Sequence, residues 1–423
     1  MVRLFNASMG KVRSPFATRL VKRPSYQLDK NQIIEGNKLP IDPPRFIKLG
    51  IQLDPNTGQE IGDFYLPFDD REHEPAALIW GGSGSGKSVA LARIESEISF
   101  NYSRSILIFD FKNQYRYAYL PNDNPRHIEI LKAHGEAPRG ISNTKCFLPI
   151  HVVNKYGDEF CKLTYGYTDT WKLTLNDCDT AGLLMLGQKE LEGMAYILFL
   201  ESAITTVRKR DGVITIASLI DELSASKEEE GTSKKSVDTI IGMIKALSKM
   251  GILTDKGNSV LELMHPPRRP GLGGDVFIFN LAGAGPDDIQ TRGILINLLN
   301  GICHSLKNKI NIQPVLAIEE ASSFFSREAT QNMKTALNQL HYVMGRSLGI
   351  FRLYIYQRKN QIPLDLMDDK GVSILIETMN NFQLGNGQQL SGAGIAKVTI
   401  RDVTFMPNDL FLVKILPPRC KVS

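Results

Sequence analysis

The sequence has no long apolar run, and this bears first on where the protein can reside. Its longest apolar tracts, "YILFLESAI" and "GILINLLNGI", fall far short of the roughly 20 apolar residues that a membrane-spanning helix requires. The N-terminus, "MVRLFNASMGKVRSPF", is basic but lacks the apolar segment of a secretory leader. We therefore expect a soluble, cytoplasmic protein that has no membrane partner.

Cysteine is scarce and scattered. The chain of 423 residues contains five cysteines, and no two of them form a C-x-x-C pair. A disulfide framework or a cysteine-rich metal cluster is therefore not expected, and a reducing compartment is favoured. The five are Cys146, Cys161, Cys178, Cys303 and Cys420.

A strong excess of one charge is also missing, except at the N-terminus. Fifty Lys and Arg against 45 Asp and Glu give a net charge of +5, which permits a polyanionic partner without requiring one. Residues 1–47 hold nine of the basic residues and only three acidic ones. We interpret this segment as a basic arm, either a solvated tail or one that contacts nucleic acid or a neighbouring subunit.

From residue 48 onward, apolar runs of strand length alternate with segments of helical periodicity. Strands that alternate with helices favour a mainly parallel sheet covered by helices on both faces, which is an α/β fold. Helices are predicted over 89–99 and 287–306. The predicted strands lie within 76–80, 105–111, 275–283, 314–320 and 351–357.

This core is predicted to run over residues 48–187 and 271–423, with a mostly helical insert at 188–270. In "SVDTIIGMIKALSKMGILT" the apolar residues recur at helical spacing until Gly251. The insert is either a lid packed on the core or a winged-helix reader of DNA. The apolar residues at this spacing are Val237, Ile240, Ile241, Ile244 and Leu247.

The stretch "GGSGSGKS", residues 81–88, matches the pattern G-x-x-x-x-G-K-[ST] and follows a predicted strand. Its glycines allow successive backbone N–H groups to surround phosphate oxygens, and the following helix adds its dipole. We predict that it binds ATP with Mg²⁺, Lys87 reaching the β- and γ-phosphates and Ser88 ligating the metal. A flexible glycine turn is the alternative. The expected nucleotide-binding residues are Gly82, Ser83, Gly84, Ser85, Gly86, Lys87 and Ser88.

Two adjacent glutamates end the predicted strand "PVLAIEE". Successive strand residues face opposite sides, so one of the two carboxylates must point where its apolar predecessors are buried. Phosphoryl transfer needs an acid near the metal and a carboxylate that positions the attacking water. We therefore expect Glu319 beside Mg²⁺ and Glu320 as the water activator. The alternative is a solvated pair that starts the next helix.

Two further polar residues are candidates for catalysis. Gln357 ends the predicted strand "FRLYIYQ", where a polar side chain can sense the γ-phosphate, although a surface glutamine would also suit this place. Arg346 lies just before that strand. At a subunit edge it would complete a neighbour's site and stabilise transition-state charge; otherwise it is a surface arginine.

Together these segments resemble the HerA/FtsK superfamily of DNA-pumping ATPases, and the HerA branch most closely. "GGSGSGKS" is similar to the family's phosphate loop, and "GDFYLPFDD" to the strand that precedes it. "LIFDFKNQY" resembles a family strand that ends in Asp, here Asp110. "GGDVFIFNLAG", "LAIEEAS" and "GRSLGIFRLYIYQR" resemble later strands in the family's order, and the similar segments span most of residues 60–360.

The resemblance implies a RecA-like P-loop core and a homo-hexameric ring that binds ATP between subunits and pumps double-stranded DNA. Glu320 then activates water, Arg346 acts in trans and Gln357 is a sensor. Three features depart from the family pattern. Glu319 stands where the family usually has Asp, Gln114 where it often has Glu, and residues 1–60 are short for the N-terminal β-barrel of HerA proteins. The mode of docking to a nuclease partner is accordingly left open.

Three functions fit these features. The leading hypothesis is a Mg²⁺-dependent ATPase that translocates DNA with little sequence preference, since phosphate contacts dominate such binding. The second is an ATP-controlled switch that binds DNA or a partner without processive movement. The third is a motor for DNA packaging or conjugative transfer, which shares the chemistry and differs in partner. The basic triplet at 208–210 is a candidate DNA contact, with a solvated surface segment as the alternative.

Overall fold

The computed structural model describes most of the chain from residue 45 onward. Arg346 and the helix predicted over 287–306 lie outside the described residues. The described residues are 45–69, 76–102, 104–171, 173–176, 178, 180, 183–184, 194–228, 234–255, 275–283, 315–323, 325, 350–368, 372–401 and 409–422.

Strands and helices alternate through the described core, as predicted, and each of the five predicted strands is present. The strands are β1 (Arg45–Leu53), β2 (Glu60–Asp69), β3 (Ala76–Gly81), β4 (Ile106–Asp110), β5 (Thr144–Pro149), β6 (Asp169–Trp171), β7 (Val276–Asn280), β8 (Val315–Ile318), β9 (Phe351–Tyr356), β10 (Val372–Gln383), β11 (Gln389–Ile400) and β12 (Asp409–Ile415). The helices are α1 (Lys87–Asn101), α2 (Pro125–Ala133), α3 (Ile150–Tyr156), α4 (Asp158–Tyr165), α6 (Met194–Asp211), α7 (Ile216–Ala225), α8 (Lys234–Lys249) and α13 (Leu364–Asp368), with short 3₁₀ turns η1 (Ser226–Glu228), η2 (Ala321–Ser323) and η4 (Lys359–Gln361).

The described strands form one sheet of twelve, in the order β2-β1-β12-β11-β10-β3-β9-β8-β4-β7-β5-β6. From β10 to β6 every neighbouring pair is parallel, and from β2 to β10 every pair is antiparallel. The predicted α/β fold with a mainly parallel sheet is therefore confirmed. The antiparallel hairpin of β10 and β11 was not predicted from the sequence.

Strand register brings the carboxyl ends of four strands together. β9 lies between β3 and β8, with Tyr356 opposite Trp80 and Ile318 opposite Tyr354. On the other side of β8, Ile318 lies opposite Phe109 of β4. Residues that follow these strands therefore meet at one edge of the sheet, as expected for parallel strands.

Apolar side chains of the parallel strands alternate between two cores. Ala77, Ile79, Ile106 and Ile108 pack with helix α1 on one face. Leu78, Leu107, Phe109 and Phe279 face the other side, where Phe109 and Phe279 stack with ring centroids 5.2 Å apart. The strands are thus buried on both faces, which explains their continuous apolar runs.

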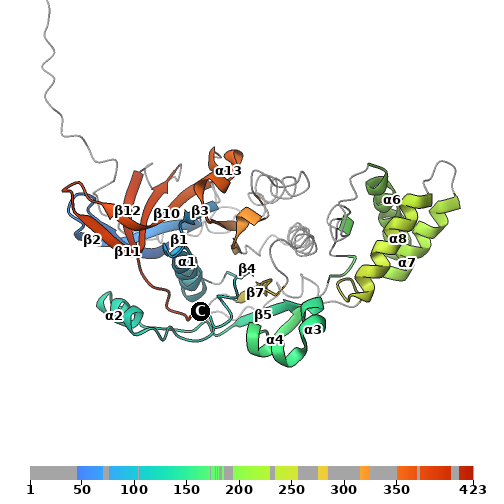
Figure 1. The fold of residues 1–423 in the computed structure, drawn as a ribbon, viewed down its shortest axis with the longest axis horizontal. Coiled ribbons are helices and arrows are strands. Elements are labelled where there is room, and N and C mark those ends of the chain that lie inside the picture. Colours follow the sequence, from blue (N-terminus) through green and yellow to red (C-terminus); the bar gives the residue numbers. More distant parts are fainter. Residues whose placement is uncertain are drawn as a thin grey trace, which may run out of the picture.

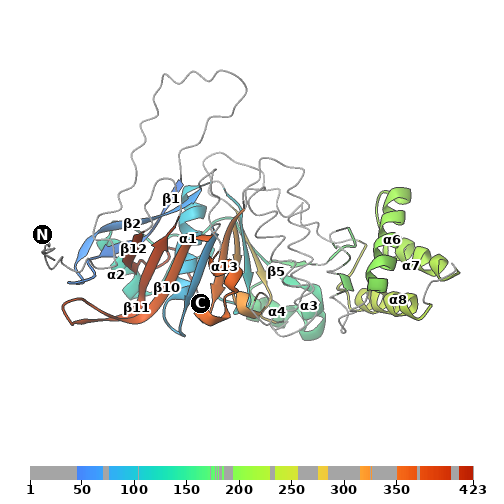
Figure 2. The ribbon, with the colours of Figure 1, turned by 90° about the horizontal axis from the view of Figure 1, so that it is seen from above.

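Helices α6, α7 and α8 form a lobe at one end of the molecule, opposite the antiparallel strands (Figures 1 and 2). In α8 the five apolar residues whose spacing predicts a helix are all buried. The apolar cluster of the lobe continues into the core through Trp171 and Leu173, and Leu173 bridges to Leu253 after α8. Residues 194–228 and 234–249 are thus mostly helical and share a core with the sheet.

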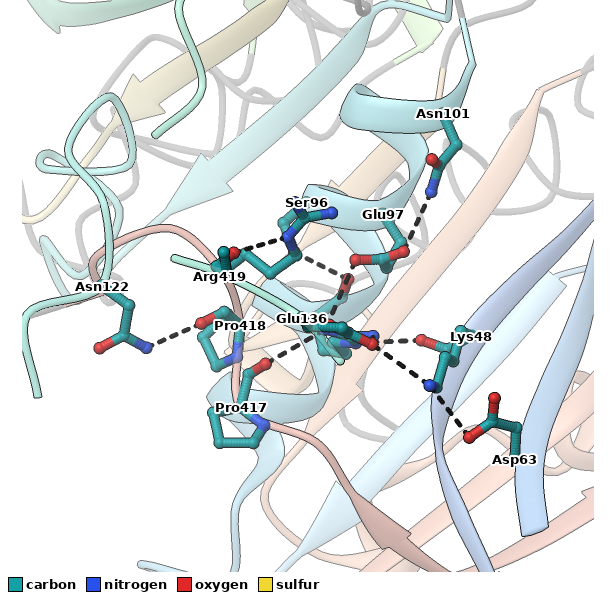
Figure 3. Close-up of polar contacts among 12 residues, drawn as sticks. Lys48, Asp63, Ser96, Glu97, Asn101, Asn122, Glu136, Pro417, Pro418 and Arg419 are labelled. Atoms are coloured by element: carbon teal, nitrogen blue, oxygen red, sulfur yellow. Dashed lines mark hydrogen bonds and ion pairs between the residues drawn. The ribbon is translucent and has the colours of Figure 1, made fainter. Parts of the chain in front are cut away.

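Helix α1 is buried on nearly all sides, including at polar residues of its middle turns. Arg93, with 0% exposure, donates from Nε to Lys48 O of β1 at 3.0 Å and from both terminal nitrogens to Glu136, at 2.5 and 2.8 Å. A further bond reaches Pro417 O at 3.4 Å. Figure 3 shows Lys48, Glu136 and Pro417 converging on α1 from three separate segments. We call Arg93 with these three partners the helix anchor.

No helix among the described residues combines the length and the apolar character that crossing a membrane requires.

Candidate active site

The glycine-rich loop connects the end of β3 to the start of α1, as the motif predicts. The residue that caps α1 is Gly86, at φ 101° and ψ 16°, and no side chain caps the helix. The first turn of α1 carries no acidic residue. Because the first N–H groups of a helix have no partner within it, this uncapped N-terminus is suited to an anion such as a phosphate.

Two positions of the loop favour glycine, each for a different structural reason. A Cβ on Gly81 would lie 2.2 Å from Thr378 Oγ1 and 2.3 Å from Thr378 O of β10, so no side chain fits there. Gly84 has φ 71° and open space around its Cα, a backbone conformation that favours glycine. Ser85 Oγ lies 2.6 Å from Thr378 Oγ1 and donates to Gly82 O at 2.8 Å. The loop is therefore fastened to β10 as well as to β3.

Lys87 is buried and lies folded over this loop. Its Nζ donates to Gly81 O at 2.7 Å and to Gly82 O at 2.8 Å. Burial lowers the pKa of Lys87, and nearby Lys112 lowers it further, whereas Glu320 and Glu319 act in the opposite direction. The ammonium group is thus bonded to two carbonyl oxygens of the glycine-rich loop itself.

Glu319 follows β8 and is buried, with 2% exposure. Its Oε2 has no hydrogen-bond partner. Burial raises its pKa well above the usual value, and the neighbouring Asp110 carboxyl raises it further. A buried carboxylate oxygen without a partner is costly, and a cation at this position would satisfy it.

Glu95 of α1 adds a third acidic group behind the loop. It is fully buried, its Oε1 has no hydrogen-bond partner, and burial together with Glu319 and Asp110 raises its pKa well above the usual value. Asp110 is buried as well, and burial raises its pKa in spite of backbone hydrogen bonds to its carboxylate. These carboxyl groups form an acidic cluster at the ends of β4 and β8.

Glu320 is held from two sides. Lys112 Nζ forms an ion pair with Oε1, and Gln357 Nε2 donates to Oε2 at 2.8 Å. Glu320 adopts φ 49°, which is uncommon for a residue with a side chain. The structure thus brings Lys87, Glu319, Glu320 and Gln357 to one edge of the sheet, and we call these four with Lys112 the site cluster.

The sequence did not identify Lys112 or Glu95 as site residues, nor did it predict the contact between Gln357 and Glu320. Lys112 lies two residues beyond the end of β4, and a basic residue after a strand adjacent to β8 is the signal that marks it in retrospect. Gln357 was predicted to sense the γ-phosphate, whereas here its amide contacts Glu320. Ser88 is the second residue of α1, and Arg346 lies outside the described residues.

The residues that could hold Mg²⁺ are Ser88 and Glu319. The described residues contain no group of three or more His, Cys, Asp or Glu arranged to hold a metal ion. Mg²⁺ bound with a nucleotide needs only one or two protein oxygens, since phosphates and water supply the rest. The unpartnered Oε2 of Glu319 is compatible with this role, so the residues present fit the ion.

Comparison with known proteins gives a family and a fold. A family model described as "Helicase HerA, central domain" matches residues 76–301. No curated protein sequence matches the chain closely enough to count as a relative. The solved structure of VirB4 of Thermoanaerobacter pseudethanolicus is 13% identical, with a TM-score of 0.53 over 87% of this chain and 96% of that one. The bacterial conjugative coupling protein TrwBdeltaN70 is 13% identical, with a TM-score of 0.46 over 82% of this chain and 86% of that one. The predicted RecA-like P-loop fold is thereby confirmed.

Proposed function

The chain belongs to the HerA helicase central-domain family of P-loop ATPases, and from this premise we propose that it is a Mg²⁺-dependent ATPase that forms a ring and moves double-stranded DNA. The observation that carries the proposal is the site cluster. An uncapped helix N-terminus and a buried lysine face two glutamates at the end of a nearby strand. This combination provides both phosphate binding and activation of water.

Each residue of the site has a role in this proposal. The loop N–H groups and Lys87 bind the β- and γ-phosphates, and Lys87 gives up Gly81 O and Gly82 O for them. Ser88 and Glu319 would hold Mg²⁺, which would neutralise charge at the phosphates. Glu320 orients and deprotonates the attacking water, and Gln357 fixes its carboxylate through Oε2.

The ring and the DNA substrate are inferred from the family rather than from a contact in this chain. Arg346 would act on the nucleotide of a neighbouring subunit, which requires at least two copies. A DNA-transfer motor would use the same chemistry and differ only in its partner, so it is included in the proposal. Grip on the DNA would depend mainly on phosphate contacts and therefore fall steeply with salt.

The test is the rate of phosphate release from ATP, measured with and without linear duplex DNA. We expect DNA to stimulate turnover, and we expect Lys87→Met to abolish turnover in both conditions, because its charge contacts the phosphates. Lys132→Met on α2, an exposed lysine in the last turn, is the matched control and should leave the rate unchanged. Hydrolysis that ignores DNA would contradict the motor and favour the ATP-controlled switch, in which the lobe of α6–α8 binds a partner.

A further inference from the structure

Lys112 reaches the site from a turn that the structure holds rigidly. The buried carboxylate of Asp110 accepts hydrogen bonds from the backbone N–H of Lys112 at 2.9 Å and of Tyr115 at 3.0 Å. Asn113, at φ 59°, donates to Thr164 O at 2.8 Å and accepts from Asn280 Nδ2 at 2.6 Å. The backbone of Lys112 is therefore fixed, and only its flexible four-carbon stem can move.

The backbone on the two sides of the ion pair is unusual. Within the described part of the chain, the non-glycine residues with positive φ are Asn113, next to Lys112, and Glu320. Such conformations carry a free-energy cost and concentrate at functional sites. Both members of the pair are thus presented by backbone that the surrounding contacts hold in place.

The two partners differ in exposure. The Lys112 side chain is 40% exposed and that of Glu320 is 10% exposed. Lys112 is also near enough to Lys87 to contribute to the lowered pKa of that lysine. The Lys112 ammonium therefore pairs with a buried carboxylate and lies within electrostatic reach of the phosphate-binding lysine, while part of its side chain is exposed to solvent.

The contact has a consequence for the water-activating role. While the ammonium group of Lys112 occupies Oε1 of Glu320, that oxygen is less able to accept a hydrogen bond from water. A γ-phosphate at the loop offers Lys112 a competing anion of higher charge. An ADP molecule ends at its β-phosphate and lacks this group.

Resting on the function proposed above, we propose that Lys112 is a positioning residue that exchanges between Glu320 and the γ-phosphate. In one position it restrains the water-activating carboxylate, and in the other it binds ATP and releases that carboxylate. Hydrolysis is thereby coupled to the presence of a γ-phosphate at the loop. Gln357 keeps Glu320 in place in both positions through Oε2.

The test is a double-mutant cycle in nucleotide affinity. Calorimetry with Mg²⁺ compares ADP with a non-hydrolysable ATP analogue in the wild type, Lys112→Met, Glu320→Gln and the double variant. Lys112→Met should weaken analogue binding about tenfold, the effect of losing one charge-assisted hydrogen bond, and leave ADP binding unchanged. Glu320→Gln removes the competing carboxylate and should tighten analogue binding, but only while Lys112 is present. Lys112→Arg should largely retain the affinity, and Lys132→Met is the control.

The outcomes separate this inference from the proposed function. If the wild type binds neither nucleotide, the proposed ATPase fails. If it binds both but Lys112→Met weakens both equally, or the effect of Glu320→Gln persists without Lys112, the exchange is refuted while the ATPase stands. An effect confined to the analogue and coupled between the two residues supports the exchange, and a merely structural role for Lys112 would not produce it.

Discussion

Two groups of polar contacts lie along helix α1, and they differ in kind. Near its N-terminal end, Lys87 of the site cluster donates to carbonyl oxygens of the glycine-rich loop, and the partly exposed Lys112 pairs with Glu320. The helix anchor lies six residues further along, where the guanidinium of Arg93 is fully buried against Glu136 and two carbonyl oxygens. The first group is suited to exchanging partners, and the second to keeping the helix fixed while this happens.

The pKa shifts follow the same division. Burial alone would raise the pKa of Glu136, but the hydrogen bonds and charge of Arg93 lower it below the usual value. At the site cluster the pKa of Glu319 is raised, because burial and Asp110 are not offset by a bonded cation. The anchor carboxylate is thus stabilised in its charged form by its partner, whereas the Glu319 carboxyl has no bonded cation that would stabilise its charged form.

The largest expected effect lies in the site cluster. Glu320→Gln keeps the shape of the side chain and its contact with Gln357 but removes the proton acceptor. We expect the hydrolysis rate to fall by roughly 10²–10⁴-fold, the usual contribution of a general base, while nucleotide still binds. Phosphate release measures the hydrolysis rate, and calorimetry measures nucleotide binding. The matched control is Glu129→Gln on the exposed surface of α2, and full activity in Glu320→Gln would refute the assignment.

Arg93→Met tests the anchor. Removing the guanidinium leaves Glu136 in a partly buried site without its main partner, so the free energy of unfolding should fall by about 3–5 kcal/mol. Urea unfolding followed by circular dichroism measures this. Adding Glu136→Met to Arg93→Met should recover much of the loss, because it removes the unpaired charge. A loss no larger than that of the exposed control Arg126→Met would show that the anchor does not stabilise the fold.

Glu95→Gln tests the acidic cluster through pH. Burial, Glu319 and Asp110 raise the pKa of Glu95 above its usual 4.5, so the folded chain retains a proton that the unfolded chain releases. The contribution of this group to the free energy of unfolding is fully present below pH 4.5, the usual pKa of a glutamate. It is lost as the pH rises through the folded-state pKa. Glutamine removes the dependence, and its advantage in melting temperature should grow from about pH 5 to about pH 8. An advantage independent of pH would contradict the raised pKa.

The smallest effect is expected at the surface. Lys421 and Asp123 form an exposed ion pair, with nitrogen and oxygen 2.5 Å apart, near the C-terminal end of the described chain. Water and salt screen such pairs strongly. Asp123→Asn should therefore change the melting temperature far less than Arg93→Met does. The small difference between Asp123→Asn and the wild type should vanish at high salt. A large effect of Asp123→Asn that persists at high salt would mean that this pair stabilises the fold as the helix anchor does.

The sequence predicts the parts of this molecule that depend on local pattern. Five strands of the parallel half, β3, β4, β7, β8 and β9, follow from apolar runs, and the loop at 81–88 follows from a motif in which the structure requires glycine at Gly81 and favours it at Gly84. The meeting of Lys87, Glu319, Glu320 and Gln357 also follows, because parallel strands bring their carboxyl ends to one edge. The division into an arm, a core and an insert stays a prediction.

What was not predicted depends on tertiary contacts. Lys112 reads as an ordinary basic residue after a strand until the pairing of β4 with β8 brings it to Glu320. Glu95 and Arg93 read as the polar side of an amphipathic helix, but other segments cover that side and bury both residues. The sequence predicts this helix, but the burial of its polar residues depends on segments that are distant in the chain and cannot be inferred from the helix alone.

The most direct test of the account is amide hydrogen exchange of the wild-type protein with and without Mg²⁺ and a non-hydrolysable ATP analogue. The account predicts that exchange changes in peptides covering 81–88, 110–115 and 318–322. Peptides covering 91–99 and 416–420, which contain or adjoin the helix anchor, should keep the same protection. No change at the first group, or an equal change in both groups, would contradict a nucleotide site that exchanges partners beside a fixed anchor.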